Sequence, residues 1–109
     1  MNDIILIAGV LIELGLTVIG VKQMKSPTPV SFYPGDEPPS ENMLKDLKKW
    51  NYGHGILWMA YGIIVLICFW LASESDDGLI KALLMFCGAI LPAGGMALGH
   101  SILRKKFYL

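Results

Sequence analysis

The sequence lacks a disulfide framework, a net charge and any recognisable catalytic motif. Its two cysteines, Cys68 and Cys87, are too few for a disulfide-stapled fold and do not have the spacing of a metal site. Basic and acidic residues balance at nine each, so nothing indicates a nucleic-acid partner. We find no phosphate-binding loop and no nucleophile paired with a base. The sequence therefore predicts a protein that is not an enzyme and uses no metal or other cofactor.

What the chain has in abundance is apolar sequence. Hydrophobic residues make up 54% of its 109 residues, which is too apolar for a soluble domain of this size. Residues 3–21, 52–72 and 79–103 are each long enough to cross a hydrocarbon core of roughly 30 Å as a helix. The runs are unbroken, unlike the alternating strands of a membrane barrel. The sequence predicts one all-α membrane domain, a bundle of three transmembrane helices.

Basic residues predict the orientation of these helices. Eight of the nine lie in the connection 22–51 or in the C-terminal tail, whereas the turn after the second span carries Glu74, Asp76 and Asp77. Lys and Arg concentrate on the cytoplasmic side of membrane proteins. We therefore expect the loop and the C-terminus in the cytoplasm and the N-terminus outside.

The connection 22–51 divides into two parts. Five prolines between Ser26 and Ser40 exclude a continuous helix, which predicts a proline-rich cytoplasmic loop. After Ser40, apolar residues recur at helical spacing and alternate with lysines. This pattern predicts a short amphipathic helix over residues 41–51, lying on the membrane surface before the second span.

One stretch of the chain resembles known membrane proteins. The run "PVSFYPGDEPPSENMLKDLKKWNYGHGILWMAYGII" from Pro29 to Ile64, with the later "HSILRKKFY", is similar to uncharacterised three-helix membrane proteins of Gram-positive anaerobes. The loop that ends in Trp50 and Asn51 more distantly resembles the membrane immunity proteins related to SdpI. Their Tyr-Arg-Thr motif is absent, and Tyr33-Pro34-Gly35 stands in its place. The resemblance implies a location in the bacterial plasma membrane.

Glu13 is the one acidic residue inside a predicted span. A charged side chain at the bilayer centre costs at least about 2.5 kcal/mol, so it is expected to face a partner or a cavity. Gly9, Thr17 and Gly20 share its helix face, which we expect to be packed. The carboxyl is either a proton or cation site together with Thr17, or a protonated group that joins helices. In this segment alone, the chain resembles small multidrug-resistance transporters, which have four spans and no proline-rich loop.

Two further sets of residues stand out in the second and third spans. An antiparallel hairpin places His54 and His100 at similar depth near the inner membrane interface, where we expect them to be interfacial histidines rather than metal ligands. Gly88, Pro92, Gly95 and Gly99 share one face of the third span, which predicts a close helix-packing interface and a kink. Aromatic residues near the span ends, including Trp50 and Trp70, are typical of interfacial belts.

Two functions fit these features. The first is a plasma-membrane protein that acts by helix–helix binding, as an accessory or immunity-type partner of another membrane protein. The second is a homo-oligomeric, proton-coupled transporter of a cation or small amphiphile that uses Glu13. Both place the protein in the lipid bilayer, as a homo-oligomer or bound to a larger membrane protein.

Overall fold

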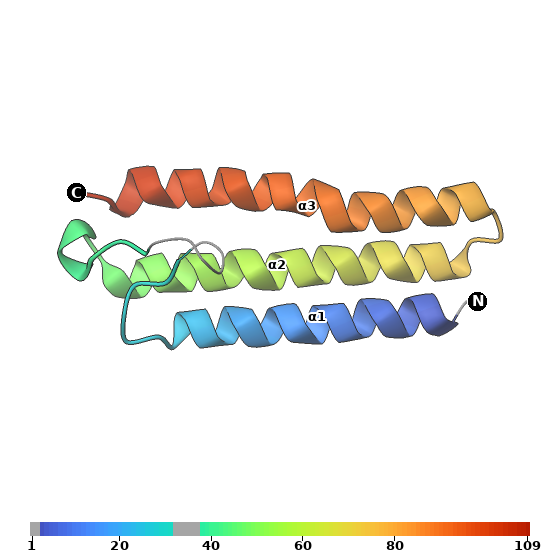
Figure 1. The fold of residues 1–109 in the computed structure, drawn as a ribbon, viewed down its shortest axis with the longest axis horizontal. Helices are drawn as coiled ribbons and strands as arrows, with labels where there is room; N and C mark the ends of the chain where they lie inside the picture. The colour runs from blue at the N-terminus through green and yellow to red at the C-terminus, as the bar shows by residue number, and fades with distance from the viewer. Residues whose placement is uncertain (1–2, 32–37) are drawn as a thin grey trace.

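Three long helices lie side by side in one layer (Figure 1). The computed structural model describes residues 3–31 and 38–109, and part of the proline-rich loop, including Pro34 and Gly35, lies outside these ranges. All three helices are long and apolar enough to span a membrane, so the predicted three-helix architecture is confirmed at this level. Each extends beyond its predicted span. The elements are α1 (Asp3–Met24), a short 3₁₀ helix η1 (Glu41–Met43), α2 (Leu47–Glu74) and α3 (Gly78–Phe107).

At the start of both α2 and α3, an aspartate side chain accepts hydrogen bonds from backbone amides that have no partner within the helix. Asp46 accepts a hydrogen bond from the Lys49 amide at the start of α2, and Asp77 accepts from the Leu79 and Ile80 amides at the start of α3. Each carboxylate also favours the positive end of the helix dipole. Ser75 to Asp77 form the tight connection that makes α2 and α3 an antiparallel hairpin.

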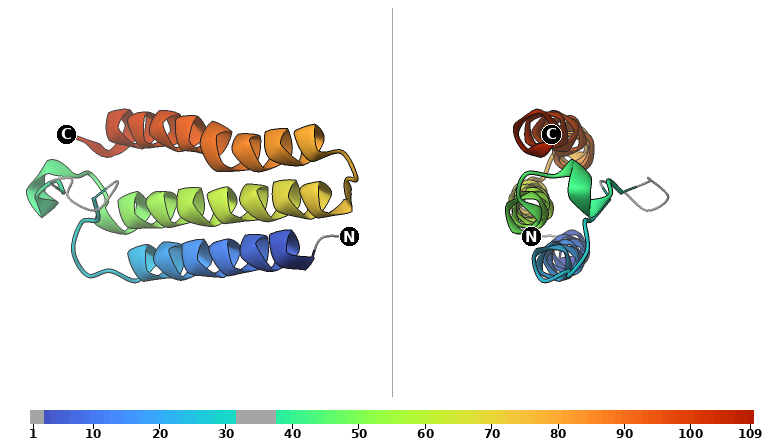
Figure 2. Two further views of the ribbon diagram at one scale, coloured as in Figure 1. Left: turned by 45° about the vertical axis from the view of Figure 1, so that its right-hand side comes forward. Right: turned by 90° about the vertical axis from the view of Figure 1, so that its left-hand side faces the viewer.

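α2 is the central helix of the layer. α2 packs against both α1 and α3, which share no comparable interface with each other. Figure 2 shows the same order along the helix axes, with η1 on one side of the layer, beside α2 and between α1 and α3. We call the end with the C-terminus the loop end, and the end with the N-terminus and the α2–α3 connection the turn end (Figure 1).

Glycines bring α1 and α2 into backbone contact. A Cβ on Gly20 would lie 2.6 Å from the Gly55 carbonyl oxygen, and one on Gly55 would lie 2.5 Å from that of Gly20. Nearer the turn end, a Cβ on Gly9 would lie 2.6 Å from Cβ of Phe69. Small residues let membrane helices approach this closely. The glycines of the predicted α1 face thus pack against α2.

The small-residue face of α3 is used mainly within the chain. A Cβ on Gly88 would meet Cys68, one on Gly99 would meet Leu57, and Pro92 is buried. Gly95 has open space instead, because it lines a cavity of about 220 Å³ between α2 and α3. Three of the four residues predicted as a packing interface therefore face α2, and Gly95 remains uncovered.

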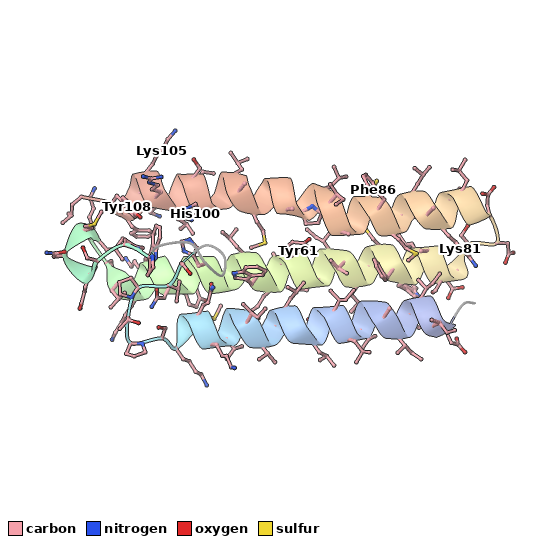
Figure 3. All side chains as sticks on the ribbon, viewed as in Figure 1. Tyr61, Lys81, Phe86, His100, Lys105 and Tyr108 are labelled. Atoms are coloured by element: carbon pink, nitrogen blue, oxygen red, sulfur yellow. The ribbon has the colours of Figure 1, made fainter. Side chains whose placement is uncertain are left out.

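The cavity lies next to Pro92, where α3 changes direction near its middle (Figure 1). Pro92 has no amide proton to donate to the Gly88 carbonyl, as the sequence predicts for a kink. One residue later, the Ala89 carbonyl accepts a hydrogen bond from the Tyr61 hydroxyl of α2. Figure 3 shows Tyr61 between the two helices. A side chain on the neighbouring helix thus binds the backbone one residue after the carbonyl that Pro92 leaves without its helical donor.

The segment 41–51 differs from the predicted surface helix. Before α2 begins at Leu47, only η1 is helical in this segment, and Leu44 has an extended backbone. The amphipathic pattern has another cause, since Leu44 and Trp50 are buried against Phe107 of α3. Of the apolar side chains that we expected on the lipid surface, Leu44, Leu47 and Trp50 join a small protein core instead, whereas Met43 stays exposed.

Adding one methyl group at Gly20 tests the close contact between α1 and α2. We expect Gly20→Ala to destabilise the fold by about 1–3 kcal/mol, because the new Cβ meets the Gly55 backbone. Gly15→Ala is the matched control on the same helix, since nothing lies within 4 Å of a Cβ there. Unfolding in lipid or detergent measures both variants. Equal stability of the two would contradict the packing described.

Candidate functional site

Two of the three buried polar residues among those described, Asn51 and His54, lie at the loop end of α2, and the third, Ser73, lies at the turn end. Trp50, Asn51 and His54 are each at most 1% exposed. His100 of α3 lies beside them, and Figure 3 shows it at the loop end near Tyr108. We call Trp50, Asn51, His54 and His100 the loop-end cluster.

Asn51 holds the loop against α2. Its amide nitrogen donates to the Ser26 and Thr28 carbonyls at 3.1 and 2.9 Å, and its Oδ1 accepts from the Val30 amide at 3.0 Å. One side chain thus satisfies three backbone groups of a segment that has no regular structure. Non-helical backbone at the edge of a membrane needs such partners.

Trp50 joins the loop to α3 and the tail. Its indole Nε1 donates to the Val30 carbonyl at 3.1 Å. Its ring lies 4.2 Å from that of His54 and 5.3 Å from that of Tyr108, measured between centroids. Trp50 is fully buried, so the prediction that it belongs to an interfacial belt is wrong. Trp70, which is 49% exposed, is compatible with that role.

The two histidines that share a depth are in direct contact. His54 Nε2 lies 2.8 Å from His100 Nδ1, and His54 Nδ1 lies 2.9 Å from the Trp50 carbonyl oxygen. A carbonyl only accepts, so His54 carries a proton on Nδ1. In the neutral pair, His54 Nε2 therefore accepts from Nδ1–H of His100. Sequence reasoning placed both residues at one depth but did not predict this bond.

The C-terminal tail closes the cluster from the other side. Leu44, Trp50 and Phe107 form the buried core there. The Lys45 amide donates to the Phe107 carbonyl at 2.7 Å, and the Leu109 amide donates to the Met43 carbonyl at 2.9 Å. The loop, α2, α3 and the tail are therefore joined at one place.

Glu13 lies apart from this cluster, on the half-buried side of α1. Its carboxylate accepts a hydrogen bond from Thr17, one turn further along the same helix. A Cβ on Gly62 would lie 3.3 Å from the Glu13 carbonyl oxygen, so this part of α1 faces α2. Both residues of the predicted proton or cation site thus lie on a single helix and bind each other, and that role stays a prediction.

The described residues bring no metal-binding set together. No group of three or more His, Cys, Asp and Glu side chains is close enough to hold an ion in ranges 3–31 and 38–109. Cys68 and Cys87 are free thiols and half-buried. Cys68 packs against Gly88, which agrees with a packing role for this thiol.

Sequence reasoning did not identify Asn51 as a loop-binding residue. A signal was available, because an amide side chain one turn into an otherwise apolar helix needs hydrogen-bond partners there. The partners themselves, the carbonyls of Ser26 and Thr28, have no sequence pattern that identifies them.

Comparisons with family models, curated proteins and solved structures give no match. The resemblance to SdpI-related immunity proteins therefore stays a prediction.

We expect Asn51→Leu to release the loop, because three backbone groups lose their partner. The cost is about 1–3 kcal/mol for buried groups left unsatisfied. Hydrogen exchange at the Val30 amide reports this directly and should become at least several-fold faster. Asn42→Leu is the control, since Asn42 is exposed and its side chain accepts a hydrogen bond from Ser40, not from the Val30 segment that Asn51 binds. Unchanged exchange in Asn51→Leu would contradict the assigned role.

The histidine pair makes a prediction about proton positions. At a pH where both rings are neutral, nitrogen-15 solid-state NMR should show His54 and His100 protonated on Nδ1. The alternative Nε2–H tautomer of His54 would place a lone pair against the Trp50 carbonyl. Observation of that tautomer would contradict the hydrogen-bond direction.

Proposed function

We propose that this protein is an integral membrane protein that acts by helix–helix binding, as an accessory or immunity-type partner of another membrane protein. The observation that supports this proposal is the open layer of three helices. Because α1 and α3 lie on opposite sides of α2, much of each stays uncovered. A chain of this shape has more helix surface for a partner than a closed bundle of the same length.

A groove across the layer is the most specific part of that surface. It has a volume of about 400 Å³ and is lined from all three helices, by Ile12 of α1, Trp58 and Val65 of α2, and Ala89 of α3 among others. The lining is almost wholly apolar. In a bilayer such a groove fits the side chains of a further helix, since packing contacts drive association there.

The competing hypothesis is a homo-oligomeric transporter in which Glu13 exchanges protons for a cation or small amphiphile. It draws support from the position of this carboxylate within an apolar helix. The Thr17 hydrogen bond binds the carboxylate to its own helix, and α2 and α3 contribute no second acid at membrane depth. We therefore favour the binding function.

Affinity purification from native membranes into nanodiscs, followed by native mass spectrometry, tests the proposal. We expect a stoichiometric partner that Ala89→Trp displaces, because the indole fills the groove. Leu91→Trp is the control, since Leu91 is 68% exposed on another side of α3.

Two results would contradict the proposal. One is a partner that both tryptophan variants retain equally. The other is a homo-oligomer without a partner that shows a pH-dependent flux in liposomes which Glu13→Gln abolishes. The second result would establish the transporter instead.

A further inference from the structure

The loop end of the protein carries most of its positive charge. Residues at this end are Lys22, Lys25, Lys45, Lys48, Lys49, Arg104, Lys105 and Lys106. Six of these eight lie around the start of α2 (Lys45, Lys48 and Lys49) and in the last turn of α3 (Arg104, Lys105 and Lys106). Basic clusters directly beside a transmembrane helix attract anionic lipids, at about 1 kcal/mol per residue near the surface.

A pocket opens within this basic region. It has a volume of about 420 Å³ and is lined by Pro38, Pro39, Ser40, Met43, Arg104 and Tyr108. This volume falls in the range of small-molecule sites, about 300–1,000 Å³. Unlike the groove at membrane depth, the pocket combines a cation and hydroxyl groups with apolar surface.

Arg104 is the charged residue of the pocket. Its guanidinium lies 5.2 Å from the centroid of the Tyr108 ring, a cation–π arrangement. Among the residues that the structure describes, no carboxylate forms an ion pair with it. The planar guanidinium therefore keeps donors for a ligand, and it suits phosphate better than an ammonium group does.

The other residues give the pocket a polar and an apolar side. Ser40 supplies a hydroxyl, which donates to Asn42 Oδ1 at 2.7 Å and keeps its own oxygen as an acceptor. Met43 is 46% exposed and offers a flexible apolar contact. Since α3 ends at Phe107, the pocket lies where the last apolar helix leaves the membrane. Lipid headgroups occupy this depth.

We propose that this pocket binds the phosphate of an anionic phospholipid, with Arg104 as the phosphate-binding residue. The glycerol and the upper acyl chain then contact Met43 and the proline side of the pocket. An anionic headgroup is favoured over a zwitterionic one, because choline or ethanolamine would bring a second cation among the lysines nearby. This site is independent of the helix-binding function proposed above.

Native mass spectrometry of the protein in mixed phosphatidylglycerol and phosphatidylcholine nanodiscs tests the site. We expect the wild-type protein to retain phosphatidylglycerol preferentially. Arg104→Gln should reduce this retention by about tenfold, as loss of a charge-assisted hydrogen bond implies. Arg104→Lys should restore it only in part, since Lys acts as a point charge.

Lys105→Gln is the matched control. It removes the same charge from the neighbouring position, and Lys105 does not line the pocket. Retention lost equally in Arg104→Gln and Lys105→Gln would overturn the proposal, because the effect would then come from diffuse charge. Equal retention of the two lipids by the wild-type protein would overturn it as well. Glycerol 3-phosphate tests the source of the phosphate. If the site binds lipid, glycerol 3-phosphate at the same concentration as phosphatidylglycerol should not displace the bound lipid. Displacement of the lipid would assign the pocket to a soluble phosphate.

Discussion

The structure depends on the need to satisfy the hydrogen-bonding groups of the non-helical backbone that follows α1. In the described part of the segment between α1 and α2, residues 25–31 and 38–46, the first turns of α2 supply hydrogen-bond partners for Ser26, Thr28 and Val30. Asn51 and Trp50 bind three residues of the loop, and Trp50 also contacts both histidines. Without these side chains, the loop carbonyls at the membrane edge would be left to water and headgroups.

This arrangement explains why a cluster of buried hydrophobic residues, Leu44, Trp50 and Phe107, lies at the loop end. Along most of their length, the helices meet in a single layer through glycines and have broad exposed apolar faces. Large buried side chains are concentrated instead where the loop, α2, α3 and the tail converge. A rigid loop end and open helix faces suit a protein that presents its helices to a partner.

The sequence was sufficient for the three helices, the Pro92 kink and the similar depth of His54 and His100 in an antiparallel hairpin. These features depend on local hydrophobic pattern and on helix geometry, which one chain contains. The buried position of Trp50 could not be predicted, because a tryptophan near a span end has the same local pattern whether it faces lipid or protein. The prediction of a single surface helix over residues 41–51 was wrong for the same reason. The apolar spacing of this segment fits contact with a membrane surface as well as contact with Phe107.

The environment of Trp50 tests the central claim most directly. The variant Trp58→Phe/Trp70→Phe leaves it as the only tryptophan, and quenchers then probe it from water (iodide) and from lipid (headgroup-depth nitroxide). Burial in protein predicts weak quenching by both. A variant that retains only Trp70 should be quenched strongly from lipid, because that side chain is 49% exposed. Equally strong lipid quenching of Trp50 would show that it faces the bilayer and would contradict the account.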